Sequence, residues 1–175
     1  MTIKTIFLDR DGVINQEGNY VYKVDDFKFI DSVFNTCKYL TALGYKLIII
    51  SNQSGISRGF YTHDDYMKLT NWMIQQFNKN KVSILDVFHC PHSPDANCTC
   101  RKPKPGMLFE AEKKHNINMK KSWMIGDKET DIVAANQAGI FNTILVRSGH
   151  KIDEENSNAK FILDSIHTSE KIITS

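Results

Sequence analysis

The sequence lacks a long apolar run, a large excess of charge of either sign, and any repeated or low-complexity segment. None of its apolar stretches approaches the roughly 20 residues that a membrane-spanning helix needs. A net charge of +2 excludes the strong electrostatic attraction that binds basic proteins to nucleic acid or to membrane surfaces. The N-terminus does not show a basic flank, an apolar core and a cleavage site in succession, so we expect a cytoplasmic protein.

The length and composition are those of an ordinary globular protein. Hydrophobic residues make up 41% of the chain and charged residues 24%, as is typical of this class. A chain of 175 residues can bury one sizeable core but is short for two. We therefore expect one domain over residues 1–175, and we favour a monomer because the pattern shows no excess of apolar surface.

Cysteine is scarce, and its placement is more informative than its number. Three of the four cysteines, Cys90, Cys98 and Cys100, lie in one short loop with His92, whereas Cys37 stands alone in a helical pattern typical of a core residue. In a chain without a secretion signal, such clustering indicates metal binding rather than disulfides. Three thiolates and one imidazole fill the four positions around a tetrahedral zinc ion, so we predict a structural zinc site in the loop 89–105.

Other interpretations of this loop stay open. His89 could be the ligand in place of His92, but alternation along a continuing strand would point it away from Cys90. A catalytic zinc would need an open coordination position, which four protein ligands do not leave. A zinc-loop module that binds nucleic acid is the main alternative outside enzymes. Against it, the C-x-H and C-x-C spacings differ from the paired C-x-x-C spacings of zinc ribbons, and a basic excess is missing.

Short apolar runs alternate with segments of helical period along the whole chain. This pattern predicts an α/β fold with a doubly wound, mostly parallel sheet of Rossmann-like type. The expected strands lie near residues 3–9, 45–51, 84–89, 122–126, 143–147 and 161–163. The expected helices lie near 33–43, 62–77, 105–115 and 128–139, and a further helix should close the tail.

Polar residues fall at the carboxyl ends of three predicted strands: Asp9, Ser51 and Asp127. In open α/β sheets, ligands bind in the crevice beyond these ends. Asp11 adds a second carboxylate beside Asp9, and Gly12 lets the backbone turn away at once. A lone D-x-D turn is as often a plain polar turn as a site, but the convergence of three strand ends favours a site.

Four short motifs occur in order along the chain: Asp9-x-Asp11-Gly12-Val13, Ser51, Lys102 and Gly126-Asp127-x-x-x-Asp131. Together they resemble the haloacid dehalogenase-like phosphatases. The resemblance implies that Asp9 attacks phosphorus and that Asp11 serves as general acid and then general base. It implies a magnesium ion held by Asp9, Asp127 and the backbone carbonyl of Asp11. Asp131 would contact these ligands and not the ion itself. Lys102 would supply positive charge to the transferring phosphoryl group.

A narrower resemblance is carried by six segments: Phe7-Leu8-Asp9-Arg10-Asp11-Gly12, Asn52-Gln53-Ser54-Gly55-Ile56, Cys90-Pro91-His92, Cys98-x-Cys100-Arg101-Lys102-Pro103, Pro105-Gly106-Met107 and Gly126-Asp127-Lys128. Over residues 3–149 the chain is similar to the D-glycero-D-manno-heptose 1,7-bisphosphate 7-phosphatases. The resemblance implies a fold without a large cap domain and removal of the 7-phosphate in nucleotide-activated heptose biosynthesis. The substrate contacts that it implies, together with those of the polar turn after the second strand, are Glu17, Gly18, Asn19, Tyr20, Ser51, Asn52, Gln53, Ser54, Arg101, Lys102 and Lys128.

The residues do not fix the substrate. Histidinol-phosphate phosphatases share the pattern, so histidinol phosphate or another small phosphorylated metabolite is an alternative, as is a binding protein with an inactive site. Val13 stands where many relatives have threonine, and the interval from His92 to Cys98 is shorter than the family pattern, which leaves the anomer of the sugar open. Arg101 could clasp a second phosphate through its guanidinium group.

Overall fold

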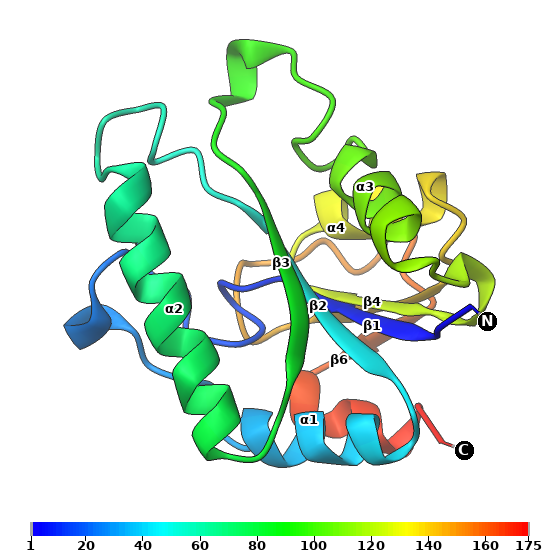
Figure 1. Cartoon of the computed structure of the whole chain (residues 1–175). Helices are drawn as coiled ribbons and strands as arrows, with labels where there is room; N and C mark the ends of the chain where they lie inside the picture. The colour runs from blue at the N-terminus through cyan, green and yellow to red at the C-terminus, as the bar shows by residue number, and fades with distance from the viewer. Residues whose placement is uncertain (1, 175) are drawn as a thin grey trace.

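The apolar runs fold into one six-stranded sheet (Figure 1). The structure is a computed structural model, and it describes residues 2–174. The strands are β1 (Thr5–Leu8), β2 (Lys46–Asn52), β3 (Ile84–Cys90), β4 (Trp123–Gly126), β5 (Asn142–Val146) and β6 (Phe161–Leu163). Each of them lies where the sequence predicted a strand.

The strands are ordered β3-β2-β1-β4-β5-β6, and every hydrogen-bonded pair is parallel. At the centre of the sheet, Phe7 of β1 pairs with Ile48 of β2 and with Met124 of β4. The order reverses at this point, because β2 and β3 are added on one side of β1 and the later strands on the other. This topology confirms the predicted doubly wound fold, and it places a ligand crevice beyond the carboxyl ends of β1 and β4.

The helices form where the sequence predicted them. Within residues 2–174 the α-helices are α1 (Val33–Ala42), α2 (His63–Lys79), α3 (Gly106–His115) and α4 (Glu129–Gln137). α2 begins at a capping box, in which the Thr62 hydroxyl accepts from the Asp65 N–H at 3.1 Å and the Asp65 carboxylate accepts from the Thr62 N–H at 3.0 Å. α1 is followed by Gly44, whose φ of 85° is a left-handed conformation suited to glycine.

Two cores lie on the two faces of the sheet, with α1 and α2 on one face and α3 and α4 on the other (Figure 1). Leu47 and Ile49 of β2 point into the first core, and Ile48 and Ile50 point into the second. All four are 0% exposed, and burying each such side chain contributes about 1.5–3 kcal/mol. Cys37 is 0% exposed in the first core, as predicted.

The connections hold no second domain, although those over residues 9–32 and 147–160 are long. Four 3₁₀ helices lie in the described connections: η1 (Val24–Asp26), η2 (Pro94–Ala96), η3 (Met119–Lys121) and η4 (Ile166–Lys171). The chain between β1 and β2 holds only η1 and α1, and the chain between β2 and β3 holds only α2, so no large cap covers the site edge. The predicted closing helix is the 3₁₀ helix η4, which packs on α1. In the part of the chain that the structure describes, no helix has the length and apolar character to cross a membrane.

Candidate active site

The loop after β1 carries the first two predicted catalytic residues. The Asp9 N–H donates to the Ile125 carbonyl at 3.0 Å, so Asp9 keeps its place at the carboxyl edge of the sheet. Gly12 then turns the chain with a φ of 83°. A Cβ at Gly12 would lie 2.4 Å from Asp127 Oδ2, so glycine is required both for the turn and for the close approach of the two loops. The loop after β1 is thereby pressed against the end of β4.

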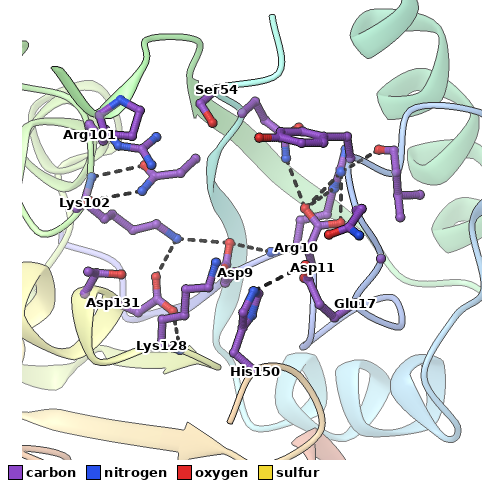
Figure 2. A pocket seen from close by; sticks show the side chains of 18 of the residues that line it. Asp9, Arg10, Asp11, Glu17, Ser54, Arg101, Lys102, Lys128, Asp131 and His150 are labelled. Carbon is purple, nitrogen blue, oxygen red and sulfur yellow. Dashed lines mark hydrogen bonds and ion pairs between the residues drawn. The ribbon is translucent and has the colours of Figure 1, made fainter. Parts of the chain in front are cut away.

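Lys102 lies at the centre of a buried cluster of charges (Figure 2). Its Nζ is 3.0 Å from Asp9 Oδ1 and 2.7 Å from Asp131 Oδ1, and it donates to the Ile50 carbonyl at 2.7 Å. Burial favours the neutral amine, but the charges of Asp131 and Asp9 outweigh it and raise the pKa of Lys102. Lys102 therefore stays protonated and presents a fixed positive charge beside Asp9.

The buried carboxylates outnumber this ammonium group. Burial raises the pKa of Asp9 to about 6, with the Lys102 charge opposing the rise and the Asp131 and Asp11 charges adding to it. Burial and the charge of Asp9 also raise the pKa of Asp127, which is 0% exposed. A second cation would lower the electrostatic cost of keeping these groups ionised.

The ligand set for such a cation is present. Carboxylate oxygens of Asp9, Asp127 and Asp131 lie within 4.8 Å of one another. Asp127 Oδ1 is buried and has no hydrogen-bond partner among the described residues, whereas Asp127 Oδ2 accepts from the His150 N–H at 3.0 Å. A buried polar atom left without a partner costs about 1–3 kcal/mol. Oxygen ligands are those that magnesium prefers, so these residues fit the predicted ion.

Asp11 is restrained by three side chains. Arg10 donates to both of its oxygens, from Nε to Oδ2 at 3.1 Å and from Nη2 to Oδ1 at 2.9 Å. Asn15 Nδ2 and Gln53 Nε2 donate to the same carboxylate at 3.0 and 3.2 Å. Burial acts to raise the pKa of Asp11, but the Arg10 charge and these hydrogen bonds bring it below its ordinary value. Asp11 is therefore ionised in this arrangement, which is the state that accepts a proton.

The polar turn after β2 also holds other parts of the site in place. Ser51 is 1% exposed, and its hydroxyl accepts from Gln53 Nε2 at 2.6 Å. The side-chain amide of Asn52 donates to the Lys102 carbonyl at 3.0 Å and accepts from the Lys102 N–H at 3.1 Å. The carbonyl oxygen of the Gln53 side chain accepts from the Tyr61 hydroxyl at 2.6 Å. This turn therefore fixes the backbone of Lys102 across 50 residues of sequence.

A cavity of about 380 Å³ opens over these charges (Figure 2). The predicted site residues that line it are Asp9, Asp11, Glu17, Gly18, Asn19, Tyr20, Asn52, Gln53, Ser54, Arg101, Lys102 and Lys128. Ser51 and Asp127 are buried and do not line it. Arg58, Tyr61 and His150 also line the cavity and were not singled out from the sequence. The first two follow the polar turn by only a few residues, whereas His150 is separated from the last motif by α4 and β5 and carries no local signal.

One rim of the cavity combines aromatic rings with a positive charge. Tyr20 has a φ of 59°, and its ring centroid lies 4.4 Å from that of Phe60. Arg58 donates to the Tyr20 hydroxyl and places its guanidinium carbon 5.3 Å from the Phe60 ring centroid. This rim offers aromatic faces together with hydroxyl and guanidinium donors, a combination that suits a polar ligand with negative charge.

The cysteine loop converges as the sequence predicted. Cys90 Sγ lies 3.6 Å from Cys98 Sγ and 3.1 Å from Cys100 Sγ, and His92 Nδ1 lies 3.3 Å from Cys100 Sγ. All four ligand atoms are within 4.8 Å of one another. His89 packs instead on a tyrosine ring of α2, with centroids 4.2 Å apart. Three thiols and one imidazole nitrogen are a donor set that suits zinc.

Comparisons with known proteins agree with this geometry. A family model described as HAD-hyrolase-like matches residues 99–169. D-glycero-alpha-D-manno-heptose-1,7-bisphosphate 7-phosphatase of Photorhabdus laumondii is 44% identical over 178 residues, covering 98% of this chain and 97% of that protein. The chain belongs to the haloacid dehalogenase-like heptose bisphosphate phosphatases. D-glycero-beta-D-manno-heptose-1,7-bisphosphate 7-phosphatase of Pasteurella multocida is 41% identical over 177 residues, covering 97% of this chain and 96% of that protein.

A solved structure from the same family has the same fold. D,D-heptose 1.7-bisphosphate phosphatase from B. bronchiseptica, complexed with magnesium and phosphate, superposes with a TM-score of 0.85 at 26% identity and covers 97% of each chain. These comparisons therefore confirm the family that the sequence motifs predicted. The relatives named above differ in the anomer that their names give, alpha in one and beta in the other.

Proposed function

We propose that this chain is a magnesium-dependent phosphatase that removes the 7-phosphate of D-glycero-D-manno-heptose 1,7-bisphosphate through a phosphorylated Asp9. The observation that carries the proposal is the pairing of Asp9 with Lys102 on the wall of the cavity, next to the unpartnered Oδ1 of Asp127. The names of the relatives support the sugar bisphosphate as substrate. The reaction would then serve nucleotide-activated heptose biosynthesis.

Two displacements account for the reaction. In the first, a carboxylate oxygen of Asp9 bonds to phosphorus, the bond from phosphorus to the sugar oxygen breaks, and Asp11 gives a proton to that oxygen. Because Asp11 is ionised in the free site, it must take up this proton when the substrate binds. In the second, Asp11 takes a proton from water, whose oxygen bonds to phosphorus and releases inorganic phosphate from Asp9. Asp9 Oδ1 accepts from the Arg10 N–H at 2.8 Å and pairs with Lys102, so we assign the attack to Oδ2.

The proposed site has two sources of positive charge, a bound magnesium ion and the side chain of Lys102. Asp9, Asp127 and the backbone carbonyl of Asp11 would hold the magnesium ion. When bound, that ion offsets the charges of the carboxylates and of the phosphoryl group. Lys102 adds a second positive charge, held in place by the Ile50 carbonyl and by Asp131. Asp131 thus supports the lysine.

The loop 89–105 would hold a structural zinc ion through Cys90, His92, Cys98 and Cys100. Arg101 directly follows this cluster, and its Nη1 donates to the His92 carbonyl at 3.3 Å. The zinc would therefore fix the direction from which Arg101 enters the cavity. Glu17 to Tyr20 and Lys128 line the same cavity and would supply the remaining contacts that the family resemblance implies.

The test is phosphate release with Mg²⁺ from both anomers of the heptose bisphosphate and from histidinol phosphate, compared by kcat/KM. We expect one of the bisphosphate anomers to exceed histidinol phosphate by at least about tenfold, because histidinol phosphate has no second phosphate to pair with Arg101 or Arg58 at the cavity. A higher kcat/KM for histidinol phosphate would reject the substrate while keeping the chemistry. No release from any of the three would reject the phosphatase assignment.

A further inference from the structure

The segment that follows β5 crosses the carboxyl edge of the sheet and contacts both aspartate loops. Ser148 Oγ donates to the Gly12 carbonyl at 2.6 Å. A Cβ on Gly149 would lie 2.1 Å from Asp127 Oδ2, so the chain can pass this close only because position 149 is glycine. The His150 N–H then donates to the same oxygen at 3.0 Å. The segment Ser148–His150 is therefore built directly onto Asp127.

The imidazole of His150 extends this contact into the cavity (Figure 2). Its Nδ1 lies 2.6 Å from Asp127 Oδ2, and its Nε2 lies 3.4 Å from Glu17 Oε1. Glu17 and His150 both line the cavity, whereas Asp127 is 0% exposed below it. One side chain thus joins the buried carboxylate to the loop that the family resemblance assigns to the sugar.

The two oxygens of Asp127 consequently have different surroundings. Oδ2 has two contacts with His150, and Oδ1 has no hydrogen-bond partner among the described residues. Holding Oδ2 fixes the rotation of the carboxylate, which leaves Oδ1 as the oxygen available to a cation. Side chains that hold a metal-binding carboxylate in this way raise the affinity of the site because they remove its alternative orientations.

We propose that His150 is a positioning residue of the magnesium site, which orients Asp127 through Oδ2 and couples that ligand to Glu17. This inference rests on the proposed function in taking the cation at Asp127 to be Mg²⁺. Loss of such an outer partner typically lowers metal affinity by about 10–100-fold. The backbone N–H of His150 is kept in every side-chain variant, so we expect a loss near the lower end of that range.

Three substitutions separate the two contacts of the imidazole. In His150→Asn the amide nitrogen takes the place of Nδ1, so it still donates to Asp127 but does not reach Glu17. In His150→Gln the amide takes the place of Nε2, so it reaches Glu17 but leaves Asp127. His150→Ala removes both contacts. The asparagine variant is therefore the matched control for the other two.

The experiment is calorimetric titration of the full chain with Mg²⁺ alone, without substrate. We expect the Kd for Mg²⁺ to rise about tenfold in His150→Ala and His150→Gln, and to stay within about threefold of the wild-type value in His150→Asn. Unchanged binding in His150→Gln, or equal losses in the asparagine and glutamine variants, would overturn the proposal. The contrast between these two variants decides the question even if His150→Ala does not fold.

Failure of this inference can be told apart from failure of the proposed function. Binding of Mg²⁺ by the wild-type protein with no effect of His150→Gln overturns the role of His150 alone. A wild-type protein that binds no Mg²⁺ overturns the metal-dependent mechanism and this inference with it. The substrate does not enter the measurement, so a wrong sugar leaves the result unaffected.

Discussion

At the residue scale, one buried carboxylate carries the proposed chemistry. Burial raises the pKa of Asp9 to about 6, and Lys102, 3.0 Å away, opposes this rise. Asparagine has nearly the same shape but is a far weaker nucleophile toward phosphorus. We therefore expect Asp9→Asn to lower kcat for the heptose bisphosphate by at least about 10³-fold, as measured by phosphate release with saturating Mg²⁺.

The control for this prediction is a second aspartate that the site does not use. Asp31 is exposed ahead of α1, so Asp31→Asn should leave kcat unchanged while removing the same charge from the protein. Thermal unfolding of both variants would show that the fold is kept. If Asp9→Asn retained a tenth or more of the wild-type kcat, the nucleophile would have to be another residue.

Sequence reasoning located the charged residues of the site better than their neutral neighbours. Spacing alone placed Asp9 and Asp127 at strand ends, because buried strands are recognisable and their carboxyl ends share one edge. The same reasoning named Asn52 as a substrate contact, and Asn52 lines the cavity, but it did not find the two hydrogen bonds of this amide with the backbone of Lys102. No local pattern reports such a long-range contact. His150 was missed for the same reason, because its partners lie 23 or more residues away.

At the scale of elements, the cysteine loop is the part that packing alone explains least. Between β3 and α3 the chain makes only the short 3₁₀ helix η2, none of whose residues is buried. A metal can hold such a loop where apolar burial cannot. We expect the wild-type chain to carry one zinc per molecule by elemental analysis, and Cys98→Ser to lose it and lower Tm by at least about 5 °C.

Cys37→Ala provides the matched control for that substitution. Cys37 is buried in α1, far from the loop in sequence, so its loss should leave the zinc content at the wild-type level. Kinetics add a functional readout, since Lys102 follows the last ligand by two positions and should be displaced when the loop loosens. Wild-type protein prepared without chelator that contained no zinc would contradict the assignment.

The contact between α3 and the edge strand β3 gives a prediction about pH. Asp86 Oδ2 lies 2.7 Å from Lys114 Nζ and 2.7 Å from His115 Nε2. Burial acts to raise the pKa of Asp86, but hydrogen bonds from Lys114 and His115 bring it below its ordinary value. A carboxyl whose pKa is lower in the folded state stabilises the protein above its unfolded pKa, and this stability is lost as pH falls through the folded value.

We therefore expect Asp86→Asn to lower the free energy of unfolding at pH 7 by about 0.5–1 kcal/mol. The difference from the wild-type protein should shrink once the pH falls below about 4, where the unfolded aspartate becomes protonated. Urea unfolding at pH 7 and at pH 3 measures this difference in the free energy of unfolding, with Asp31→Asn as the control. An equal loss at pH 7 and at pH 3 would show that Asp86 acts through packing rather than charge.

Most elements of the fold were predictable, because the four inner strands β1, β2, β4 and β5 are largely buried and appear as continuous apolar runs. The helices carried two clear boundaries, the capping box at Thr62 and the left-handed glycine at Gly44. The closing segment was harder to specify. Residues 166–171 form a 3₁₀ helix, and the threonine and serine in this short stretch are weak helix formers. The apolar residues of the tail predicted that it packs on the domain, but they did not predict a 3₁₀ helix in place of an α-helix.

At the scale of the whole molecule, the doubly wound sheet gathers the site from distant parts of the chain without a cap domain. The cavity is lined from the ends of β1 and β2, from the zinc loop, and from the segments before α4 and after β5. Selection among phosphorylated substrates must then come from these loops. Three arginines line the cavity. Arg10 is buried and paired with Asp11, which leaves Arg101 beside the cysteines and Arg58 on the aromatic rim to meet a substrate.

The second phosphate of the substrate could bind at Arg101 or at Arg58, and substitution of each arginine distinguishes the two positions. If Arg101 binds it, Arg101→Met should lower kcat/KM for the heptose 1,7-bisphosphate by about 10–100-fold, because a hydrogen bond to a charged group contributes about 1.5–3 kcal/mol. Arg101→Met should have a much smaller effect on heptose 7-phosphate, which lacks the second phosphate. Zinc content must stay at the wild-type level, so that the effect is assigned to the guanidinium group.

Arg58→Met is the matched comparison, since Arg58 lies on the same cavity but donates to Tyr20 on the aromatic rim. A selective loss on the bisphosphate in Arg58→Met, with none in Arg101→Met, would place the second phosphate at the aromatic rim and not at Arg101. Equal losses on both substrates in Arg101→Met would mean that Arg101 acts on the reacting phosphate. Each outcome fixes which loop reads the far end of the sugar, and the anomer preference can then be traced to that loop.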